Sequence, residues 1–205
     1  MLEFLSQIDW TAFLIAMFVI ELTPGPNMSW LAATSARYGR KAGIIAVFGV
    51  TLGLAVQVIA AAAGLSTIFT HFPVVYQIMS WAGVIFMLWL AWEAFADVGT
   101  ASPTMGHSSS GFTRGFIANI LNPKALLFYI AVVAQFASPS HGGLWLQVLI
   151  LGSVHLLVSI IVHLSIVMLG AQFGQTFKSW STTLYARLIF SLSIFAIAIW
   201  IAIST

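Results

Sequence analysis

The chain has 205 residues, of which 60% are hydrophobic and 6% charged, with a formal net charge of +2. An average soluble domain carries about 25% charged residues, so this composition excludes an ordinary soluble protein. The 7 basic residues are spread over several loops and form no patch, so nucleic acid is not an expected partner. Cysteine is absent, which excludes disulfides and thiolate metal sites, and we expect no metal and no cofactor.

The N-terminal stretch MLEFLSQIDW carries Glu3 and Asp9 but no Lys or Arg before the first apolar run. A secretory signal peptide needs a basic beginning and a small-residue cleavage site. We therefore expect the first apolar segment to remain as a membrane helix.

Two stretches, residues 42–92 and 125–177, contain no Asp, Glu, Lys or Arg. Each is long enough to cross a bilayer core twice at about 20 residues per helix. Continuous apolar runs favour helices, because membrane strands alternate apolar and polar residues. Polar, Gly and Pro clusters divide the chain into six apolar spans, residues 8–30, 43–69, 74–95, 112–136, 144–169 and 184–203. The expected fold class is an all-α integral membrane protein with six transmembrane helices in a single domain, residues 1–205.

The basic residues predict the orientation, because Lys and Arg collect in cytoplasmic loops. Loops one, three and five carry or adjoin them, whereas loops two and four carry none; the residues are Arg37, Arg40, Lys41, Arg114, Lys178 and Arg187. Loops one, three and five are therefore expected in the cytoplasm, with both termini outside.

Residues 96–111 form the longest expected cytoplasmic loop, with the Gly, Ser, Thr and Pro composition of a flexible linker. This linker divides the chain into two halves of three helices, about residues 8–95 and 112–203. Because three is odd, the second half enters the membrane from the opposite side. Two related halves would then form an inverted repeat, in which transporters hold their substrate near the midplane at broken helices.

Both halves carry a helix-breaking motif in their first span, TPGPN at residues 23–27 and NPK at residues 122–124. A rise of 1.5 Å per residue places both motifs about 15–20 Å deep, near the middle of a ~30 Å hydrocarbon core. Proline ends a helix at the preceding residues, so the first half-helix should stop near Leu22. Thr23-Pro24 and Asn122-Pro123 each read as an N-cap followed by proline at the first helical position. The sequence thus predicts that helices 1 and 4 are broken.

A broken helix offers N–H groups with a positive dipole end for a carboxylate and free carbonyls for an ammonium. Such backbone must line protein or a water-filled cavity, and Gly25 permits close approach of a ligand. Glu21 and Lys124 are ionisable groups of opposite sign beside the two breaks, and at that depth each needs a partner. They suggest a site for a zwitterion, in which Glu21 attracts the α-ammonium while Lys124 and Asn122 attract the α-carboxylate. The alternative is a buried Glu21–Lys124 ion pair with kinks that serve packing alone.

The candidate substrate-binding residues are Glu21, Thr23, Pro24, Gly25, Pro26, Asn27, Asn119, Asn122, Pro123 and Lys124. The candidates for proton coupling are Glu21, His155 and His163. The two histidines lie eight residues apart on one face of the fifth span, with Ser159 between them. They are candidates for a proton relay, but the favoured interpretation is that they are neutral core residues bonded to a neighbouring helix. A metal site is disfavoured because that helix has no cysteine and no carboxylate.

Gly49 and Gly53 form a GxxxG pair in the second span, with Gln57 one turn further on. Such a pair brings helices close together. Packing within one protomer is the favoured interpretation, and a homodimer face is the alternative.

TPGPN at 23–27, the glycine series Gly39, Gly43, Gly49 and Gly53, and FTRGFIANILNPKALLFYIAVVAQF at 112–136 resemble the LysE/RhtB family of amino-acid exporters. The resemblance implies a six-helix protein of the bacterial inner membrane that exports amino acids or close derivatives, is driven by the proton gradient and is not an enzyme. By the same resemblance, the signature positions are Pro24, Gly25, Pro26, Asn27, Asn122, Pro123 and Lys124. Two features depart from the family pattern: Ala134 replaces a common proline, and Glu93 and Asp97 stand where basic residues often follow helix 3.

Two other classes of function stay open on the residues alone. An ion exporter of the same architecture would bind its ion at Glu21 and the histidines of the fifth span. A membrane enzyme is the least favoured class, because the sequence offers no local nucleophile motif. The absence of a GxxxxGK[ST] motif favours a secondary transporter over one driven by ATP.

Overall fold

The computed structural model of the chain describes residues 2–22, 25–64, 108–122, 124–125, 128–137, 142–176 and 184–204, and isolated positions between 74 and 92. Every regular element in these ranges is helical, as the sequence predicts. The elements are α1 (Leu2–Gln7), α2 (Trp10–Leu22), α3 (Pro26–Ala62), α6 (Ser108–Ile120), the π-helical segment η2 (Phe128–Val133), α8 (Ala134–Phe136), α9 (Leu144–Thr176) and α11 (Leu184–Ser204). Within the described part of the chain, Asn27–Ala62 and Leu144–Thr176 are long and apolar enough to cross a membrane.

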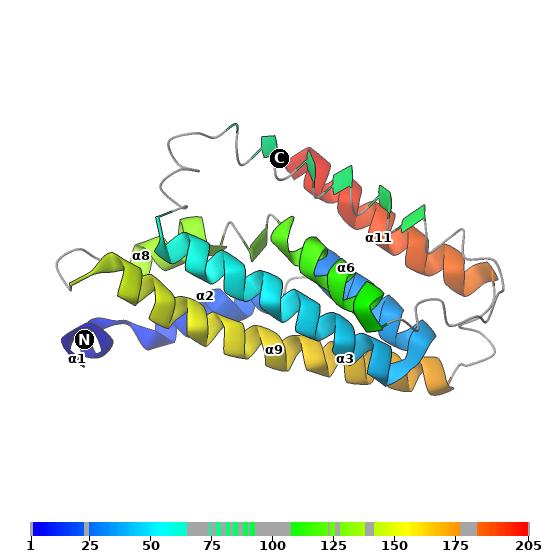
Figure 1. Cartoon of the computed structure of the whole chain (residues 1–205), viewed down its shortest axis with the longest axis horizontal. Helices are drawn as coiled ribbons and strands as arrows, with labels where there is room; N and C mark the ends of the chain where they lie inside the picture. The colour runs from blue at the N-terminus through cyan, green and yellow to red at the C-terminus, as the bar shows by residue number, and fades with distance from the viewer. Residues whose placement is uncertain are drawn as a thin grey trace.

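The long helix α3 consists of two helical stretches that meet at Gly39. The backbone of Gly39 leaves the helical region, with φ 85° and ψ 176°. Only glycine adopts such a conformation without strain. Figure 1 shows the first stretch continuing the direction of α2 and the second stretch turning back beside α9. Gly39 is therefore the corner between the first and second expected spans.

The described helices follow the expected spans with shifted ends. α11 agrees closely with the sixth span, whereas α9 continues to Thr176, past the expected end at residue 169. α6 begins at Ser108, so the last part of the expected linker is helical, contrary to the prediction. Of the third expected span, residues 74–95, only isolated positions between 74 and 92 are described, and each of these is helical. The rest of the linker lies outside the described residues. The arrangement of six helices in an inverted repeat therefore stays a prediction.

Glycines allow α3 to pack closely against α6 and α9. A side chain at Gly49 would overlap the carbonyl oxygen of Phe112 in α6, and one at Gly53 would lie 2.9 Å from the carbonyl oxygen of Phe116. On α9, a side chain at Gly174 would overlap the carbonyl oxygen of Ala36. The GxxxG pair thus packs within the protomer, as favoured from the sequence, and α6 of the same chain covers this face.

The helix α9 reverses the usual pattern of a soluble protein. Its buried residues recur about every fourth position and include the polar side chains Gln147, His155, Ser159 and His163. Between them lie exposed apolar side chains such as Leu157, Ile161 and Leu169, which are 62–67% exposed. Polar groups inside and apolar groups outside suit a helix that faces lipid and lines a polar interior.

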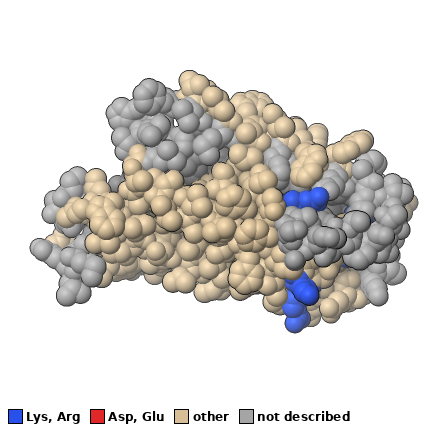
Figure 2. All heavy atoms as spheres, viewed as in Figure 1, with Lys and Arg blue, Asp and Glu red and all other residues tan. Residues whose placement is uncertain are grey.

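The described basic side chains other than Lys124 gather near one end of the molecule. Arg37, Arg40 and Lys41 flank the corner at Gly39, and Arg114 belongs to the first turns of α6. Figure 2 shows Lys and Arg atoms together toward the end where α3 turns back, and the rest of the visible described surface carries no charge. Exposed apolar side chains of α3 and α9, such as Phe48, Ile59, Leu157 and Ile161, suit a bilayer.

Candidate functional site

The first interruption separates α2 from α3. α2 ends at Leu22, where the sequence predicts a stop, and Gly25 precedes α3 in an extended conformation, with φ −146° and ψ 175°. The helix restarts at Pro26, with Gly25 at the N-cap position and no side-chain capping bond. The prediction of a restart at Pro24 capped by Thr23 is wrong in its position, because the backbone is still extended at Gly25. Thr23 and Pro24 themselves lie outside the described residues.

The second interruption follows α6, which ends at Ile120. The side-chain oxygen of Asn122 accepts a hydrogen bond of 3.1 Å from the backbone N–H of Lys124, and residues 124–125 are again helical. This bond is the one that an N-cap makes with the second residue of its helix. Asn122 therefore makes the hydrogen bond expected of an N-cap, while Pro123 lies outside the described residues and the break in the fourth expected helix stays a prediction.

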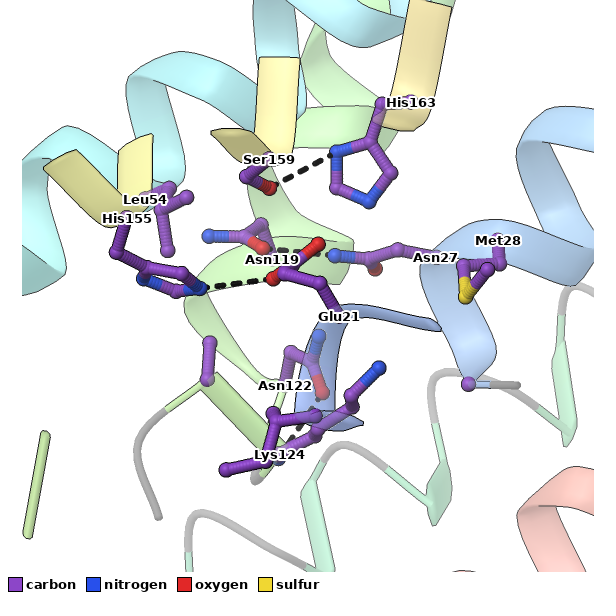
Figure 3. A pocket seen from close by; sticks show the side chains of 13 residues that line it. Glu21, Asn27, Met28, Leu54, Asn119, Asn122, Lys124, His155, Ser159 and His163 are labelled. Carbon is purple, nitrogen blue, oxygen red and sulfur yellow. Dashed lines mark hydrogen bonds and ion pairs between the residues drawn. The ribbon is translucent and has the colours of Figure 1, made fainter. Parts of the chain in front are cut away.

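The two interruptions meet at one cavity (Figure 3). Its free space is about 20 Å³, enough for roughly one water molecule. The lining residues come from both interruptions, α3 and α9: Ile20, Glu21, Gly25, Asn27, Met28, Leu54, Asn119, Asn122, Lys124, Ala125, His155, Ser159 and His163. The structure thus brings together eight of the expected substrate-site residues or proton-coupling candidates from distant parts of the sequence: Glu21, Gly25, Asn27, Asn119, Asn122, Lys124, His155 and His163.

A chain of three buried polar side chains crosses one wall of the cavity. Nε2 of His155 lies 2.8 Å from Oε1 of Glu21, and Nδ1 of His155 lies 2.8 Å from the hydroxyl of Tyr129. His155 and Tyr129 are 1% and 2% exposed, and Glu21 is 7% exposed. The ring of Phe128 stacks on that of His155, with centroids 4.0 Å apart and planes inclined by 33°. The imidazole is therefore held at both nitrogens and on one face.

An amide pair crosses the cavity between the two halves of the chain. Nδ2 of Asn27 donates a hydrogen bond of 2.7 Å to Oδ1 of Asn119. Gln57 supports this pair from α3, because its Nε2 donates to the carbonyl oxygens of Asn119 and Ile120 at 3.0 and 3.2 Å. Three buried side-chain atoms of this group have no hydrogen-bond partner within the described structure: Oδ1 of Asn27, Oε1 of Gln57 and Nδ2 of Asn119. Buried polar atoms are nearly always paired, so unpaired atoms beside a cavity indicate a place for a polar ligand or water.

The remaining candidates take separate positions. Lys124 lines the cavity together with Glu21, while the carboxylate of Glu21 contacts His155. His163 also lines the cavity, and its Nδ1 lies 3.2 Å from the hydroxyl of Ser159. The two histidines share the buried face of α9 as expected, but only His155 touches the carboxylate.

Sequence reasoning missed Tyr129 and the role of Gln57. Tyr129 belongs to an aromatic pair, Phe128-Tyr129, in an otherwise apolar run, where it resembles an ordinary core or interfacial residue. Gln57 is a lone amide in the second span, which is a usable signal because a polar group at that depth needs a partner. Neither partner could be named before the helices were placed.

Comparisons with known proteins identify the family of the chain. A family model described as LysE type translocator matches residues 18–205. The homoserine/homoserine lactone efflux protein of Salmonella typhimurium strain LT2 is 30% identical over 177 residues, covering 83% of this chain and 82% of that protein. The leucine efflux protein of Enterobacter sp. strain 638 is 32% identical over 179 residues, with coverage of 83% and 82%. An uncharacterized membrane protein of Vibrio cholerae serotype O1 is 26% identical over 174 residues.

No solved structure matches the chain. The family model covers all but the first 17 residues, including both interruptions, the cavity and α9. The chain is a membrane protein and belongs to the LysE type translocators.

Proposed function

We propose that this protein exports amino acids or close derivatives across the bacterial inner membrane as a secondary transporter coupled to protons. The observation that carries the proposal is the cavity in which both helix interruptions converge with Glu21 and Lys124. The family description supports transport rather than catalysis. Two relatives are named for the efflux of homoserine, homoserine lactone and leucine, which supports a substrate of the amino-acid class.

The α-ammonium is the charged group that these three named compounds share. Homoserine lactone has no free α-carboxylate, and leucine has no polar side chain. A carboxylate at the cavity is therefore the group that all three require, and Glu21 is the carboxylate that lines it. Lys124 and the first N–H groups of α3 bind the α-carboxylate when the substrate has one.

Substrate binding requires the cavity to open, because about 20 Å³ holds roughly one water molecule and not an amino acid. In the structure, the Asn27–Asn119 hydrogen bond joins the two halves of the chain across the cavity. Rocking of one inverted repeat against the other would separate these residues and admit substrate from alternate sides. Loops one, three and five are cytoplasmic in this proposal, and both termini are outside.

The proposal is tested by uptake into inverted membrane vesicles, in which export appears as accumulation. Radiolabelled L-homoserine and L-leucine should accumulate when the vesicle interior is made acidic, and a protonophore should abolish this accumulation. Depletion of ATP at a constant proton gradient should leave it unchanged, since the chain has no ATP-binding loop.

Glu21→Gln should reduce accumulation at least tenfold, because an amide keeps the size but loses the charge that binds the ammonium. Asp9→Asn is a matched control, because Asp9 is exposed and its Oδ1 accepts a hydrogen bond from the N–H of Ala12, which an amide oxygen retains. Accumulation that persists in Glu21→Gln, at equal amounts of folded protein, would refute the site. Vesicles that accumulate a metal or alkali cation but no amino acid would favour the ion exporter instead.

A further inference from the structure

We infer that the proton and the substrate ammonium compete for Glu21, with His155 occupying the carboxylate when substrate is absent and Tyr129 positioning His155 for this exchange. This inference rests on the proposed function and deepens it. It assigns Tyr129 a role in coupling and gives His155 a specific task. Lys124 is left to recognise the carboxylate end of the substrate.

The geometry supplies one acceptor for two cationic groups. Nε2 of His155 lies 2.8 Å from Oε1 of Glu21, which is the distance at which a substrate ammonium would bind the same oxygen. The space beside the pair is about 20 Å³, too small for an amino acid, so the ammonium reaches Glu21 only when the cavity opens around the Glu21–His155 contact. Because Glu21 is 7% exposed, losing both partners at once would leave an unpaired buried charge. In the inferred exchange, the ammonium takes the place of the imidazole on Oε1, so that the carboxylate keeps a partner throughout.

The three side chains hold one extra proton without changing their partners. With Glu21 ionised and His155 neutral, the Nε2–H of His155 donates to Glu21 and the hydroxyl of Tyr129 donates to Nδ1. When one proton is added, either His155 carries it and donates from both nitrogens, or Glu21 carries it and donates to Nε2 while Nδ1–H donates to the Tyr129 oxygen. The tyrosine hydroxyl serves in all three arrangements because it both donates and accepts. Binding of the substrate ammonium to Glu21 then expels this proton, which is the exchange that an antiporter needs.

Tyr129 and Phe128 fix the imidazole for this exchange. The hydroxyl of Tyr129 lies 2.8 Å from Nδ1, and Phe128 stacks on the ring at 4.0 Å. Tyr129 does not line the cavity, so it acts on the substrate only through His155. It is a positioning residue.

Other ionisable groups near the pair come from two elements. His163 lines the cavity about two turns further along the same face of α9, and Lys124 lines it after the second interruption. α2 contributes Glu21, η2 contributes Tyr129, and α3 contributes the neutral residues Asn27, Met28 and Leu54 to the lining. His163 hydrogen-bonds Ser159, and its contact with the carboxylate is not direct. The proton therefore belongs to the Glu21–His155–Tyr129 chain, and His163 affects it only through its charge.

The test is proton release from the purified full-length protein in weakly buffered detergent with a pH indicator. Near neutral pH, L-homoserine and L-leucine both carry a charged ammonium, so a proton that appears on mixing comes from the protein. We expect about one proton per bound amino acid at the pH of maximal release, and no release from Glu21→Gln. In Tyr129→Phe, substrate affinity should stay within about threefold, while the pH of half-maximal release shifts by about one unit, because Nδ1 of His155 loses its partner.

Tyr185→Phe is the matched control, because it makes the same chemical change at a tyrosine that is 73% exposed. It should leave the release profile unchanged. Thermal unfolding of each variant excludes a trivial loss of fold. If Tyr129→Phe is destabilised in detergent, this variant is measured by exchange assays in proteoliposomes instead of by proton release. There, exchange of labelled for unlabelled amino acid should persist within about twofold, while gradient-driven accumulation falls about tenfold.

Three outcomes would overturn the inference. A wild-type protein that binds amino acid but releases no proton would refute it and leave the exporter proposal standing. A Tyr129→Phe profile identical to that of the wild type would show that the hydroxyl serves packing alone. A wild-type protein that binds neither amino acid would refute both the inference and the proposed function.

Discussion

Glu21 illustrates at the scale of a residue how a buried charge is accommodated in this protein. Its carboxylate lies 2.8 Å from Nε2 of His155, which comes from a segment 134 residues later in the chain. The sequence suggested Lys124 as the partner of Glu21, because both groups stand beside helix-breaking motifs. The structure places Lys124 at the same cavity but gives His155 the direct contact.

Substitution of Lys124 should weaken recognition of the carboxylate end of the substrate and leave recognition of its ammonium end unchanged. In Lys124→Gln we expect inverted vesicles to accumulate L-homoserine about tenfold or more slowly, since a hydrogen bond to a charged group contributes roughly 1.5–3 kcal/mol. Accumulation of homoserine lactone, which has no free carboxylate, should stay within about threefold of wild type. Both compounds are measured in the same vesicle preparation. Equal loss for the two would instead assign Lys124 to the fold or to coupling.

Substitution of both charged residues tests the alternative that Glu21 and Lys124 form a purely structural ion pair. If the pair were merely structural, the Glu21→Gln/Lys124→Gln double variant would recover folding and accumulation together, because no lone buried charge remains. The proposed site predicts a folded but inactive double variant. Accumulation normalised to folded protein decides between the two.

At the scale of the elements, close packing of α3 fixes where the polar residues lie. α3 carries Asn27 at its start and Gln57 near its end, and both contact the end of α6 around Asn119 and Ile120. Gly49 and Gly53 let α6 approach closely enough for Gln57 to reach those carbonyl oxygens. The glycines thus support the cavity without contacting it.

Gly49→Ala should therefore destabilise the protein, because the added methyl would overlap the carbonyl oxygen of Phe112. Overpacking of this kind typically costs about 1–3 kcal/mol. Gly111→Ala is the control, since a side chain there would meet only Ile45 at 3.9 Å, an ordinary contact. Thermal unfolding in detergent should show a lowered midpoint for the first variant and little change for the second. Equal midpoints would mean that α3 and α6 adjust to the methyl group.

At the scale of the whole molecule, the charge distribution predicts one orientation in the membrane. The described basic residues outside the cavity gather near the end where α3 turns at Gly39, and the flanks expose apolar side chains. Reporter fusions at residue 105 and at the C-terminus should accordingly report cytoplasm and exterior, respectively. If both fusions report the same side, the second half does not cross the membrane an odd number of times, and the inverted repeat is wrong. A fusion after Tyr38 should agree with that at residue 105.

The sequence by itself determined the membrane class, most helix positions and the two motifs around which the site forms. These follow from local chemistry: long apolar runs fit a bilayer, and proline at residues 26 and 123 limits where a helix continues. It also placed His155 and His163 on one face of a helix, because helical periodicity needs no tertiary information. The resemblance to a family of exporters rested on the same local motifs.

Tertiary structure alone decided which side chains meet. The choice of His155 over Lys124 as the direct partner of Glu21, the addition of Tyr129, and the support of Asn119 by Gln57 all depend on how α3, α6, η2 and α9 cross. The restart at Pro26 rather than Pro24 likewise depends on an extended backbone at Gly25, although either proline satisfies the local rule. The residues in these contacts lie 26 to 134 positions apart in the sequence, and packing between helices fixes which of them meet. The pattern of apolar and polar residues predicts which face of each helix is buried, but not which faces pack together.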